Sequence, residues 1–314
     1  MRCRGVTYYQ APSADADGQC ATRIIMTTFD TRLFALDAKT GIPCKYFGQN
    51  GVVDMKRGMG EFEPGMYGFT SAPAVAMDTI ILGAFLNDNI SVLERSGVIR
   101  AMDAVTGELR WAFDMGRPDH KGWPPEGETF TRGTPNMWTH AAIDEELGLV
   151  YLPLGNATPD VFGPNRRAFD NEYNSSVLAL DIRTGNERWK FQTVHRDLWD
   201  FDLPAQPSLY DVTDPATGQI VKVLIQPTKR QDIFMLNRET GEPVAEMIEK
   251  TVTTTGGNPR CLKAGCRRPS PVRSACRRPA AIPSPRPTCG ARGRSTRTAT
   301  SISSTTCACR WRSG

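Results

Sequence analysis

The 314-residue sequence lacks any uninterrupted hydrophobic run long enough to cross a membrane. Its most apolar stretch, Ser71–Leu86, is broken by Asp78 and predicts two short buried strands instead. The first residues, from Met1 to Val6, also lack the apolar core of a signal peptide. We therefore expect no membrane segment or membrane anchor within this chain.

Histidine is scarce, and the three residues present form no His-x-x-His pattern, so none is predicted to bind a metal. The nine cysteines contain no two pairs with zinc-ligand spacing, which argues against a structural zinc cluster. Cys3, Cys20 and Cys44 lie in the amino-terminal part. One disulfide can form among them if the protein is exported, and the sequence leaves its pairing open.

Acidic residues are absent from Gly257 to Gly314, a segment with twelve Arg and one Lys. Removing these 13 from the total of 38 basic residues leaves 25 against 34 acidic ones, so residues 1–256 carry a net charge of about −9. An acidic body of this kind gives no reason to expect a nucleic-acid partner. The sequence thus divides into a body, 1–256, and a basic low-complexity tail, 257–314.

The tail permits two interpretations. One is a basic, disordered arm rich in Arg, Pro, Ser and Thr. The other, which we favour, is translation of GC-rich DNA in the wrong reading frame. Arg almost without Lys, the absence of acids and scattered cysteines are typical of such a product.

One short pattern, Asp/Asn-x-x-Thr-Gly, recurs in the body at intervals of 66, 78 and 56 residues. Each copy follows an apolar strand, and its Asp or Asn and its Gly suit a tight turn. Trp111 and Trp189, each eight residues after the Asp of its copy, are predicted to pack between neighbouring sheets. The pattern indicates an all-β fold, a β-propeller or a related β-repeat. The copies are Asp37–Gly41, Asp103–Gly107, Asp181–Gly185 and Asn237–Gly241.

The segment Thr193–Pro204 has the highest density of reactive side chains. It places Asp197, Asp200 and Asp202 within six residues, beside a tryptophan and before a proline. Taken alone, such a segment is typical of a polar loop with an Asx turn and a solvated carboxylate. Its interpretation as a reactive site depends on the wider pattern.

That wider pattern resembles the PQQ-dependent dehydrogenases (PQQ is pyrroloquinoline quinone), above all the membrane-bound glucose and quinate/shikimate branch. The resemblance covers roughly residues 2–250 and implies part of an eight-bladed propeller. It rests on the Asp200 segment, on Lys229 placed 29 residues later, and on four further strings. These are Cys3–Val6, Ser96–Arg100, Thr134–Trp138 and Asp202–Pro207.

The resemblance implies roles for four residues. Asp200 matches the general base that removes the hydroxyl proton from an alcohol while hydride leaves for the quinone. Lys229 matches the cation that hydrogen-bonds the quinone oxygens. Arg4 matches a second cofactor-binding residue, and Trp138 matches an aromatic residue that packs on the PQQ ring. Without the resemblance, the lysine would be interpreted as a solvated residue and the tryptophan as a core residue.

The same resemblance implies a divalent cation beside the cofactor, Ca²⁺ or Mg²⁺. Asp88, Asn89 and Thr158 match positions near this metal, and their oxygen atoms are ligands that hard cations prefer. As isolated strings, Leu86–Asn89 and Ala157–Asp160 would be interpreted as turns. His195 either braces the Asp200 loop or has a surface role.

The implied activity is oxidation of a small sugar or cyclic polyol, D-glucose to gluconolactone or alternatively quinate or shikimate. Electrons would pass to membrane ubiquinone at the periplasmic face of the bacterial inner membrane. Several features of that family are expected to be missing here. They are a histidine before Arg4, a later carboxylate and histidine, and the membrane anchor. The rival class is a non-catalytic propeller scaffold of the outer-membrane assembly type, which needs the turns but not Asp200, Lys229, Asp88 and Trp138 together.

Overall fold

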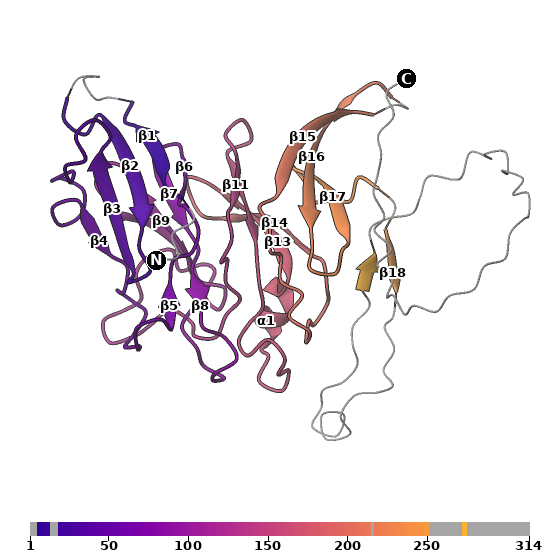
Figure 1. The fold of residues 1–314 in the computed structure, drawn as a ribbon. Coiled ribbons are helices and arrows are strands. Elements are labelled where there is room, and N and C mark those ends of the chain that lie inside the picture. Colours follow the sequence, from indigo (N-terminus) through magenta and orange to yellow (C-terminus); the bar gives the residue numbers. More distant parts are fainter. Residues whose placement is uncertain (1–4, 13–17, 215–216, 246, 251–271, 275–314) are drawn as a thin grey trace, which may run out of the picture. The chain divides into compact units, whose positions relative to one another are not determined.

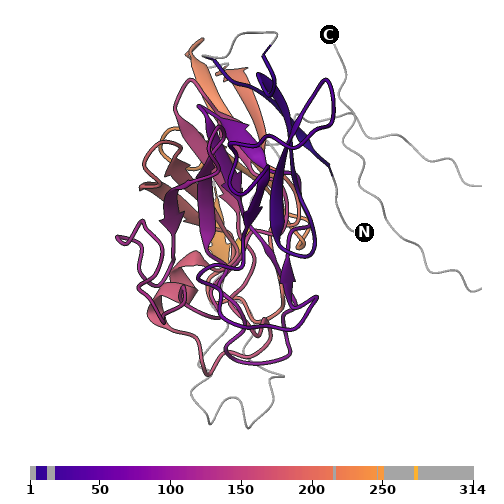
Figure 2. The same cartoon turned by 90° about the vertical axis from the view of Figure 1, so that its left-hand side faces the viewer.

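The computed structural model describes residues 5–12, 18–214, 217–245, 247–250 and 272–274. They form antiparallel sheets and one short helix, α1 (Ala168–Tyr173), so the predicted all-β class is confirmed. Among the helical segments found in these residues, none could span a bilayer. Figure 2, a side view, places α1 at one end of the sheets and not on their faces.

Four main sheets follow one another along the chain (Figure 1). The first contains β1 (Thr7–Gln10), β2 (Thr22–Thr27), β3 (Arg32–Asp37) and β4 (Val52–Asp54). The second contains β6 (Ala74–Ala76), β7 (Thr79–Leu82), β9 (Ile99–Asp103) and β10 (Leu109–Phe113). The third contains β11 (Ala142–Asp144), β12 (Leu149–Pro153), β13 (Ser176–Asp181) and β14 (Glu187–Gln192). The fourth contains β15 (Ser208–Thr213), β16 (Ile220–Pro227) and β17 (Ile233–Asn237).

Two small strand pairs complete the described part, and both are antiparallel. One joins β5 (Tyr67–Gly68) to β8 (Phe85–Leu86), so the apolar stretch Ser71–Leu86 contributes the predicted short strands β6 and β7 and, in addition, β8. The other joins β18 (Ile248–Lys250) to β19 (Val272–Ser274). Apart from β19, the tail 257–314 lies outside the described residues, and so does Arg4.

The four repeated turns have the predicted structure. Asp37 Oδ1 accepts hydrogen bonds from the amide and the hydroxyl of Thr40, both at 2.8 Å. Asp181 repeats this with Thr184, at 2.9 Å for both bonds. The glycine of every copy has a positive φ, between 68° and 76°, a region that a residue without Cβ enters at low cost. Each turn follows the third strand of its sheet.

A fifth copy of the motif, Asp214–Gly218, was not recognised in the sequence. The Thr217 hydroxyl donates to Asp214 Oδ2 at 2.9 Å, and the Gly218 amide donates to the Asp214 carbonyl at 2.8 Å. This turn lies between β15 and β16, the first two strands of the fourth sheet. It has the same motif as the other copies, but its distance from Asp181 does not fit the spacing between them.

The hydrophobic core lies between consecutive sheets, because strands such as β13 are buried on both faces. Leu178 and Leu180 pack with residues of the second sheet, whereas Val177 and Ala179 pack with residues of the fourth. Alternation with a period of two, combined with burial on both faces, produces sheets stacked face to face. This packing is the one expected for successive propeller blades.

The two tryptophans connect neighbouring sheets, as predicted. Trp111 of β10 donates its indole N–H to the Ile182 carbonyl at 2.9 Å, and a Cβ on Gly185 would lie 2.5 Å from its ring. Trp189 of β14 repeats the arrangement one sheet later, with a Cβ on Gly241 meeting its ring at 2.6 Å. The turns at Gly185 and Gly241 are thus also surfaces on which the preceding sheet packs.

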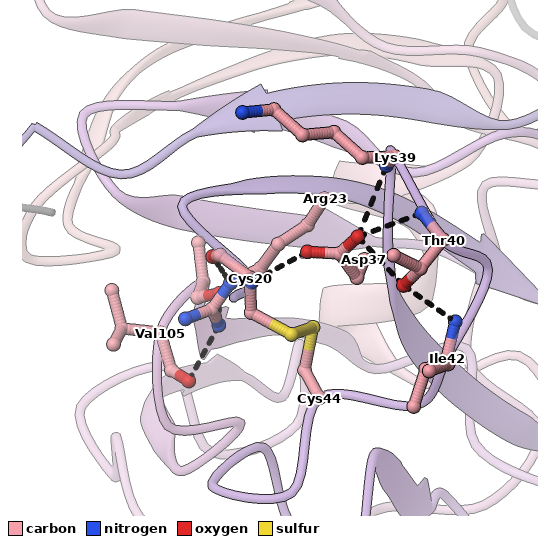
Figure 3. The surroundings of a disulfide bond; sticks show 9 residues. Cys20, Arg23, Asp37, Lys39, Thr40, Ile42, Cys44 and Val105 are labelled. Atoms are coloured by element: carbon pink, nitrogen blue, oxygen red, sulfur yellow. Dashed lines mark hydrogen bonds between the residues drawn. A yellow bond between two sulfur atoms is a disulfide. The ribbon is translucent and has the colours of Figure 1, made fainter. Parts of the chain in front are cut away.

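Cys20 and Cys44 form a disulfide with a Cα–Cα distance of 5.8 Å (Figure 3). The Cys20 amide donates to Asp37 Oδ2 at 2.6 Å, so the disulfide and the first repeated turn share one network. Cys3 lies outside the described residues. The pairing that the sequence left open is therefore Cys20 with Cys44.

Candidate active site

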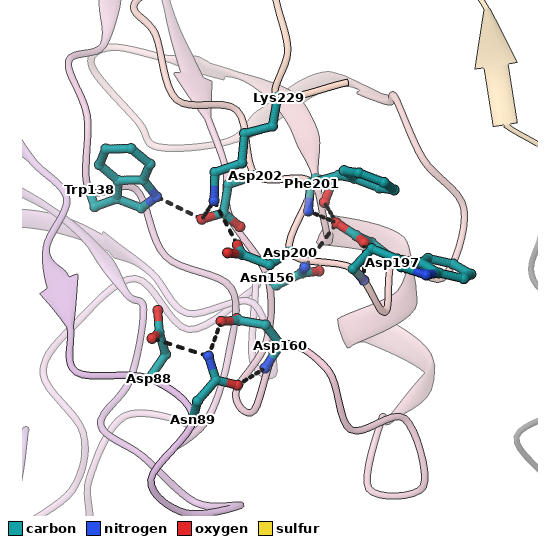
Figure 4. A network of polar contacts seen from close by, with 12 residues as sticks. Asp88, Asn89, Trp138, Asn156, Asp160, Asp197, Asp200, Phe201, Asp202 and Lys229 are labelled. Atoms are coloured by element: carbon teal, nitrogen blue, oxygen red, sulfur yellow. Dashed lines mark hydrogen bonds and ion pairs between the residues drawn. The ribbon is translucent and has the colours of Figure 1, made fainter. Parts of the chain in front are cut away.

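Asp200 and Lys229, far apart in sequence, lie in contact. Asp200 belongs to the loop between β14 and β15, and Lys229 belongs to the turn between β16 and β17. Lys229 Nζ donates to Asp200 Oδ1 at 2.7 Å and to Asp202 Oδ2 at 3.3 Å (Figure 4). The Asp200 side chain remains 43% exposed, so its carboxylate is accessible to a small molecule.

Trp138 approaches the same group from the loop between β10 and β11. Its indole N–H donates to Asp202 Oδ2 at 2.9 Å, and Lys229 Nζ lies 5.9 Å from its ring centroid. The hydroxyls of Thr70 and Ser71 donate to the Trp138 carbonyl at 2.9 and 2.7 Å, which fixes the backbone of this residue. The half-buried indole is therefore held at the edge of the carboxylate group.

Asp88, Asn89 and Thr158 come from two further loops that meet at Asp160. The Asn89 amide donates to Asp160 Oδ2 at 2.6 Å, and the Asp160 backbone N–H donates back to Asn89 Oδ1 at 3.0 Å. The Asn89 amide also lies 3.4 Å from Asp88 Oδ1. The Thr158 hydroxyl is buried and has no hydrogen-bond partner among the described residues. Asn89 has a φ of 64°, a left-handed conformation that non-glycine residues adopt rarely.

The carboxylates of this site oppose one another's ionisation. Burial raises the pKa of Asp160 to about 7, and the carboxylates of Asp88, Asp202 and Asp200 add to the rise. Burial also raises the pKa of Asp88, with Asp200 as the next contribution. In the described part of the chain, no ion pair reaches Asp88 or Asp160. The site therefore holds more negative charge than Lys229 balances.

Asp202 and Lys229 shift each other's pKa. Burial raises the pKa of Asp202, and the Lys229 ammonium partly opposes this rise. Burial alone would lower the pKa of Lys229, but the nearby carboxylates of Asp202 and Asp200 outweigh it, so the net shift is upward. Lys229 is therefore held as a cation between two acids.

The donor set differs from that of a transition-metal site. The described residues contain no group of three or more His, Cys, Asp or Glu side chains arranged to hold a metal. The oxygens that do gather come from Asp, Asn and Thr, which suit a hard cation and not zinc. The partnerless Thr158 hydroxyl and the partnerless Asp202 Oδ1 are both buried oxygens of this kind.

Two site residues were not recognised from the sequence. The sequence predicts Asp160 only as part of a turn, although its backbone amide and its carboxylate bind Asn89. Asp197 was counted among the local carboxylates, but its hydrogen bonds to the amides of Trp199 and Phe201 brace the Asp200 loop. The Asx-turn signal of the segment pointed to this role. His195 Nδ1 lies 2.7 Å from Gln192 Oε1.

Comparison with known proteins agrees with this architecture. Residues 1–264 match the family described as PQQ glucose/ethanol/alcohol dehydrogenase, β-propeller domain. Quinoprotein glucose dehydrogenase of Escherichia coli is 45% identical over 256 residues, which are 80% of this chain and 32% of that protein. Quinate/shikimate dehydrogenase (quinone) of Acinetobacter baylyi is 40% identical over 267 residues, 80% of this chain and 33% of that protein.

A solved structure shares the fold. The quinohemoprotein alcohol dehydrogenase ADHIIG from Pseudomonas putida HK5 matches with a TM-score of 0.54 and 26% identity, over 71% of this chain and 32% of its own. The chain thus spans about a third of the length of the curated relatives it matches. Through residues 1–264, it belongs to the family of PQQ-dependent glucose, ethanol and alcohol dehydrogenases with a β-propeller domain.

Proposed function

We propose that this chain provides one part of the active site of a PQQ-dependent enzyme that oxidises the hydroxyl group of an aldose, D-glucose to gluconolactone. The observation that carries the proposal is the contact of Lys229 with Asp200 and Asp202, with Trp138 bonded to the same Asp202. A propeller scaffold has no need for two acids, a lysine and a tryptophan from separate loops at one point. The names of the two curated relatives also support an oxidoreductase.

Asp200 is the proposed general base. Its carboxylate is partly exposed, and it can accept the proton of a substrate hydroxyl placed beside it. Lys229 Nζ donates a hydrogen bond to that carboxylate at 2.7 Å and so holds it in place. The same ammonium, steadied by Asp202, can donate a hydrogen bond to an oxygen that gains negative charge during oxidation.

PQQ, when bound, supplies the carbonyl carbon that accepts hydride from the substrate. Trp138 offers the face of an indole to a flat ring system, and its backbone and N–H are both fixed. Lys229 offers a positive charge to a cofactor that carries carboxylates. Arg4 is proposed to bind the cofactor as well, on the basis of the sequence resemblance.

A divalent cation, Ca²⁺ or Mg²⁺, fits the group of Asp88, Asn89 and Thr158. The fit rests on two observations. The buried Thr158 hydroxyl has no hydrogen-bond partner among the described residues and could bind a hard cation, and such a cation would offset the excess negative charge of the carboxylates. The metal would offset the negative charge that the carboxylates gather beside Asp200. The resident ion in this proposal is therefore held by oxygen ligands alone.

The proposed location is the periplasmic face of a bacterial inner membrane, with membrane ubiquinone as the electron acceptor. The Cys20–Cys44 disulfide supports an oxidising compartment, because disulfides form and persist there. The second candidate activity is oxidation of quinate or shikimate. It is supported by the 40% identity to the Acinetobacter baylyi enzyme.

A hybrid enzyme tests the proposal. Residues 5–245 would replace the matching third of the Escherichia coli quinoprotein glucose dehydrogenase, giving what we call the hybrid. We expect PQQ- and metal-dependent dye reduction with glucose, and lower rates with quinate and shikimate. Faster quinate or shikimate oxidation would select the second activity. A folded hybrid that binds PQQ and oxidises none of the three would contradict the proposal.

A further inference from the structure

Asp197 is a fully buried carboxylate next to the proposed base. Its Oδ1 accepts the Trp199 amide at 2.8 Å, and its Oδ2 accepts the Phe201 amide at 2.7 Å. These two amides belong to the residues on either side of Asp200. The Asp197 side chain therefore fixes the backbone on both sides of Asp200, the proposed base.

The backbone of Asp200 needs such support. Its φ is 60°, in the left-handed region, which is unfavourable for a residue with a Cβ. A strained residue keeps this conformation only when its surroundings enforce it. The two bonds from Asp197 meet that requirement, and they direct the carboxylate of Asp200 toward Lys229.

Asp197 also reaches two other loops. Its Oδ2 accepts a hydrogen bond from the Asn156 amide at 2.9 Å and from the Ser175 hydroxyl at 2.6 Å. Asn156 and Ser175 are buried, and the Ser175 backbone N–H donates to the carbonyl of Gly155 at 3.0 Å. Asn156 precedes Thr158 by two residues, so the connection ends beside the proposed metal group.

Arg166 extends the connection across that loop. It donates to Asn156 Oδ1 at 3.4 Å, and to the carbonyls of Pro159 and Asp160 at 3.2 and 2.8 Å. The path from Asp197 through Asn156 and Arg166 to Asp160 is continuous. By contrast, Asp181 of the third repeated turn bonds only within its own turn among the hydrogen bonds found for its side chain.

We infer that Asp197 is a positioning residue that ties the loop of Asp200 to the loop of Thr158. The tie keeps the proposed base and the proposed metal ligands at a fixed separation, and its importance for catalysis rests on the proposed function. An ordinary Asx turn would order its own loop only. The difference between these two roles can be measured on the 314-residue chain, without turnover.

The experiment compares amide hydrogen exchange in Asp197→Asn and in Asp181→Asn. The side-chain amide introduced by Asp197→Asn presents a donor where the Asp197 carboxylate accepts, so at least one bond at the tie is lost. Loss of one buried hydrogen bond corresponds to about tenfold faster exchange. We expect this increase in both 198–202 and 154–160. Asp181→Asn should change neither segment, because Asn237 already occupies the equivalent place in another copy of the turn.

A second variant, Asn156→Ala, removes the direct bond between Asp197 and the Thr158 loop but leaves the bonds that Asp197 accepts from Trp199, Phe201 and Ser175. We expect about tenfold faster exchange in 154–160, with 198–202 little changed. Should Asp197→Asn fail to fold, this variant decides the question alone. Unchanged exchange in 154–160 in both variants, or in Asn156→Ala alone in that case, would overturn the inference.

Terbium luminescence, sensitised by tryptophan and competed with Ca²⁺, supplies a spectroscopic reading of the metal group. We expect both tie variants to weaken Tb³⁺ binding about tenfold, and Asp181→Asn to leave it unchanged. Wild-type affinity in both tie variants would contradict a positioning role. If the wild-type chain binds no Tb³⁺ but Asp197→Asn still speeds amide exchange in both loops, the tie is supported and the proposed metal site is wrong.

Discussion

The repeated turns and the site loop use the same residue, aspartate, in opposite ways. In the first turn, the amide of Cys20 and the amide and hydroxyl of Thr40 lower the pKa of Asp37 to about 2. In the site, burial and neighbouring acids raise the pKa of Asp160 to about 7. The first aspartate receives several donors, most of them within its own turn, whereas the second lies among other carboxylates from different loops.

This difference explains what the sequence could predict. A turn aspartate is bonded mainly to residues of its own motif, so a local pattern predicts its role. Asp103 and Asp181 both repeat the bond that Asp37 accepts from the amide of the turn threonine. The site depends on contacts such as that of Lys229 with Asp200, 29 residues apart, and of Asn89 with Asp160, 71 residues apart. Only the family resemblance indicated that Lys229 belongs with Asp200, and nothing in the sequence indicated that Asp160 belongs with Asn89.

The largest expected effect comes from replacing aspartate by asparagine in the site loop, compared with the same replacement in a repeated turn. In the hybrid, Asp200→Asn should lower turnover by about 10²–10⁴, the usual loss on removing a general base, and should leave PQQ affinity within about tenfold. The matched control, Asp181→Asn, should retain turnover, because its role is local. Stopped-flow dye reduction measures both. Near-normal turnover in Asp200→Asn would assign the base to another residue.

The next effect concerns the packing surface of the turns. Gly185→Ala should destabilise the chain by about 2–5 kcal/mol, because it combines a left-handed φ with a clash against the Trp111 ring. Gly41→Ala shares the positive φ, but its Cβ would meet no described atom within 4 Å, so only about 1–2 kcal/mol is expected. Urea unfolding compares the two. Equal losses of unfolding free energy in the two variants would show that the packing of Trp111 does not require glycine at position 185.

Removal of the disulfide is expected to lower the free energy of unfolding by a similar or smaller amount than Gly185→Ala. Replacing Cys20 and Cys44 together by serine should cost about 3 kcal/mol, since the bond closes a segment with a sequence separation of 24. Thermal unfolding with and without reductant checks this in the unmodified chain. Insensitivity of the wild-type melting temperature to reductant would mean that the bond contributes little to stability.

The smallest effect is a pH dependence from Asp37. A carboxyl whose pKa is lower in the folded chain stabilises the fold above its ordinary value near 4, and this contribution disappears as pH falls through about 2. Asp37→Asn should therefore have a lower melting temperature than wild type at pH 7. The gap should narrow between pH 4 and pH 2. A gap that stays constant over this range would contradict the lowered pKa.

Features that depend on local contacts could be predicted from the sequence, and features that depend on contacts between distant segments could not. The four turns, the docking of Trp111 and Trp189 and the all-β class were all confirmed, because strand alternation and turn chemistry are local. The Asp214–Gly218 copy was missed because its place in the sheet breaks the spacing. Asp160 was missed as a site residue because its partner Asn89 comes from a distant segment. The link from Asp197 to a second loop was missed because Asn156 is also distant in sequence.

The most direct test of the central claim is a crystal structure of the hybrid with PQQ and Ca²⁺. We expect the cofactor to lie against the face of Trp138 and within hydrogen-bonding distance of Lys229. We expect the cation among Asp88, Asn89 and Thr158, with Asp200 facing the space that the substrate occupies. A cofactor bound away from Trp138 and Lys229, or a cation held by other residues, would contradict the central claim.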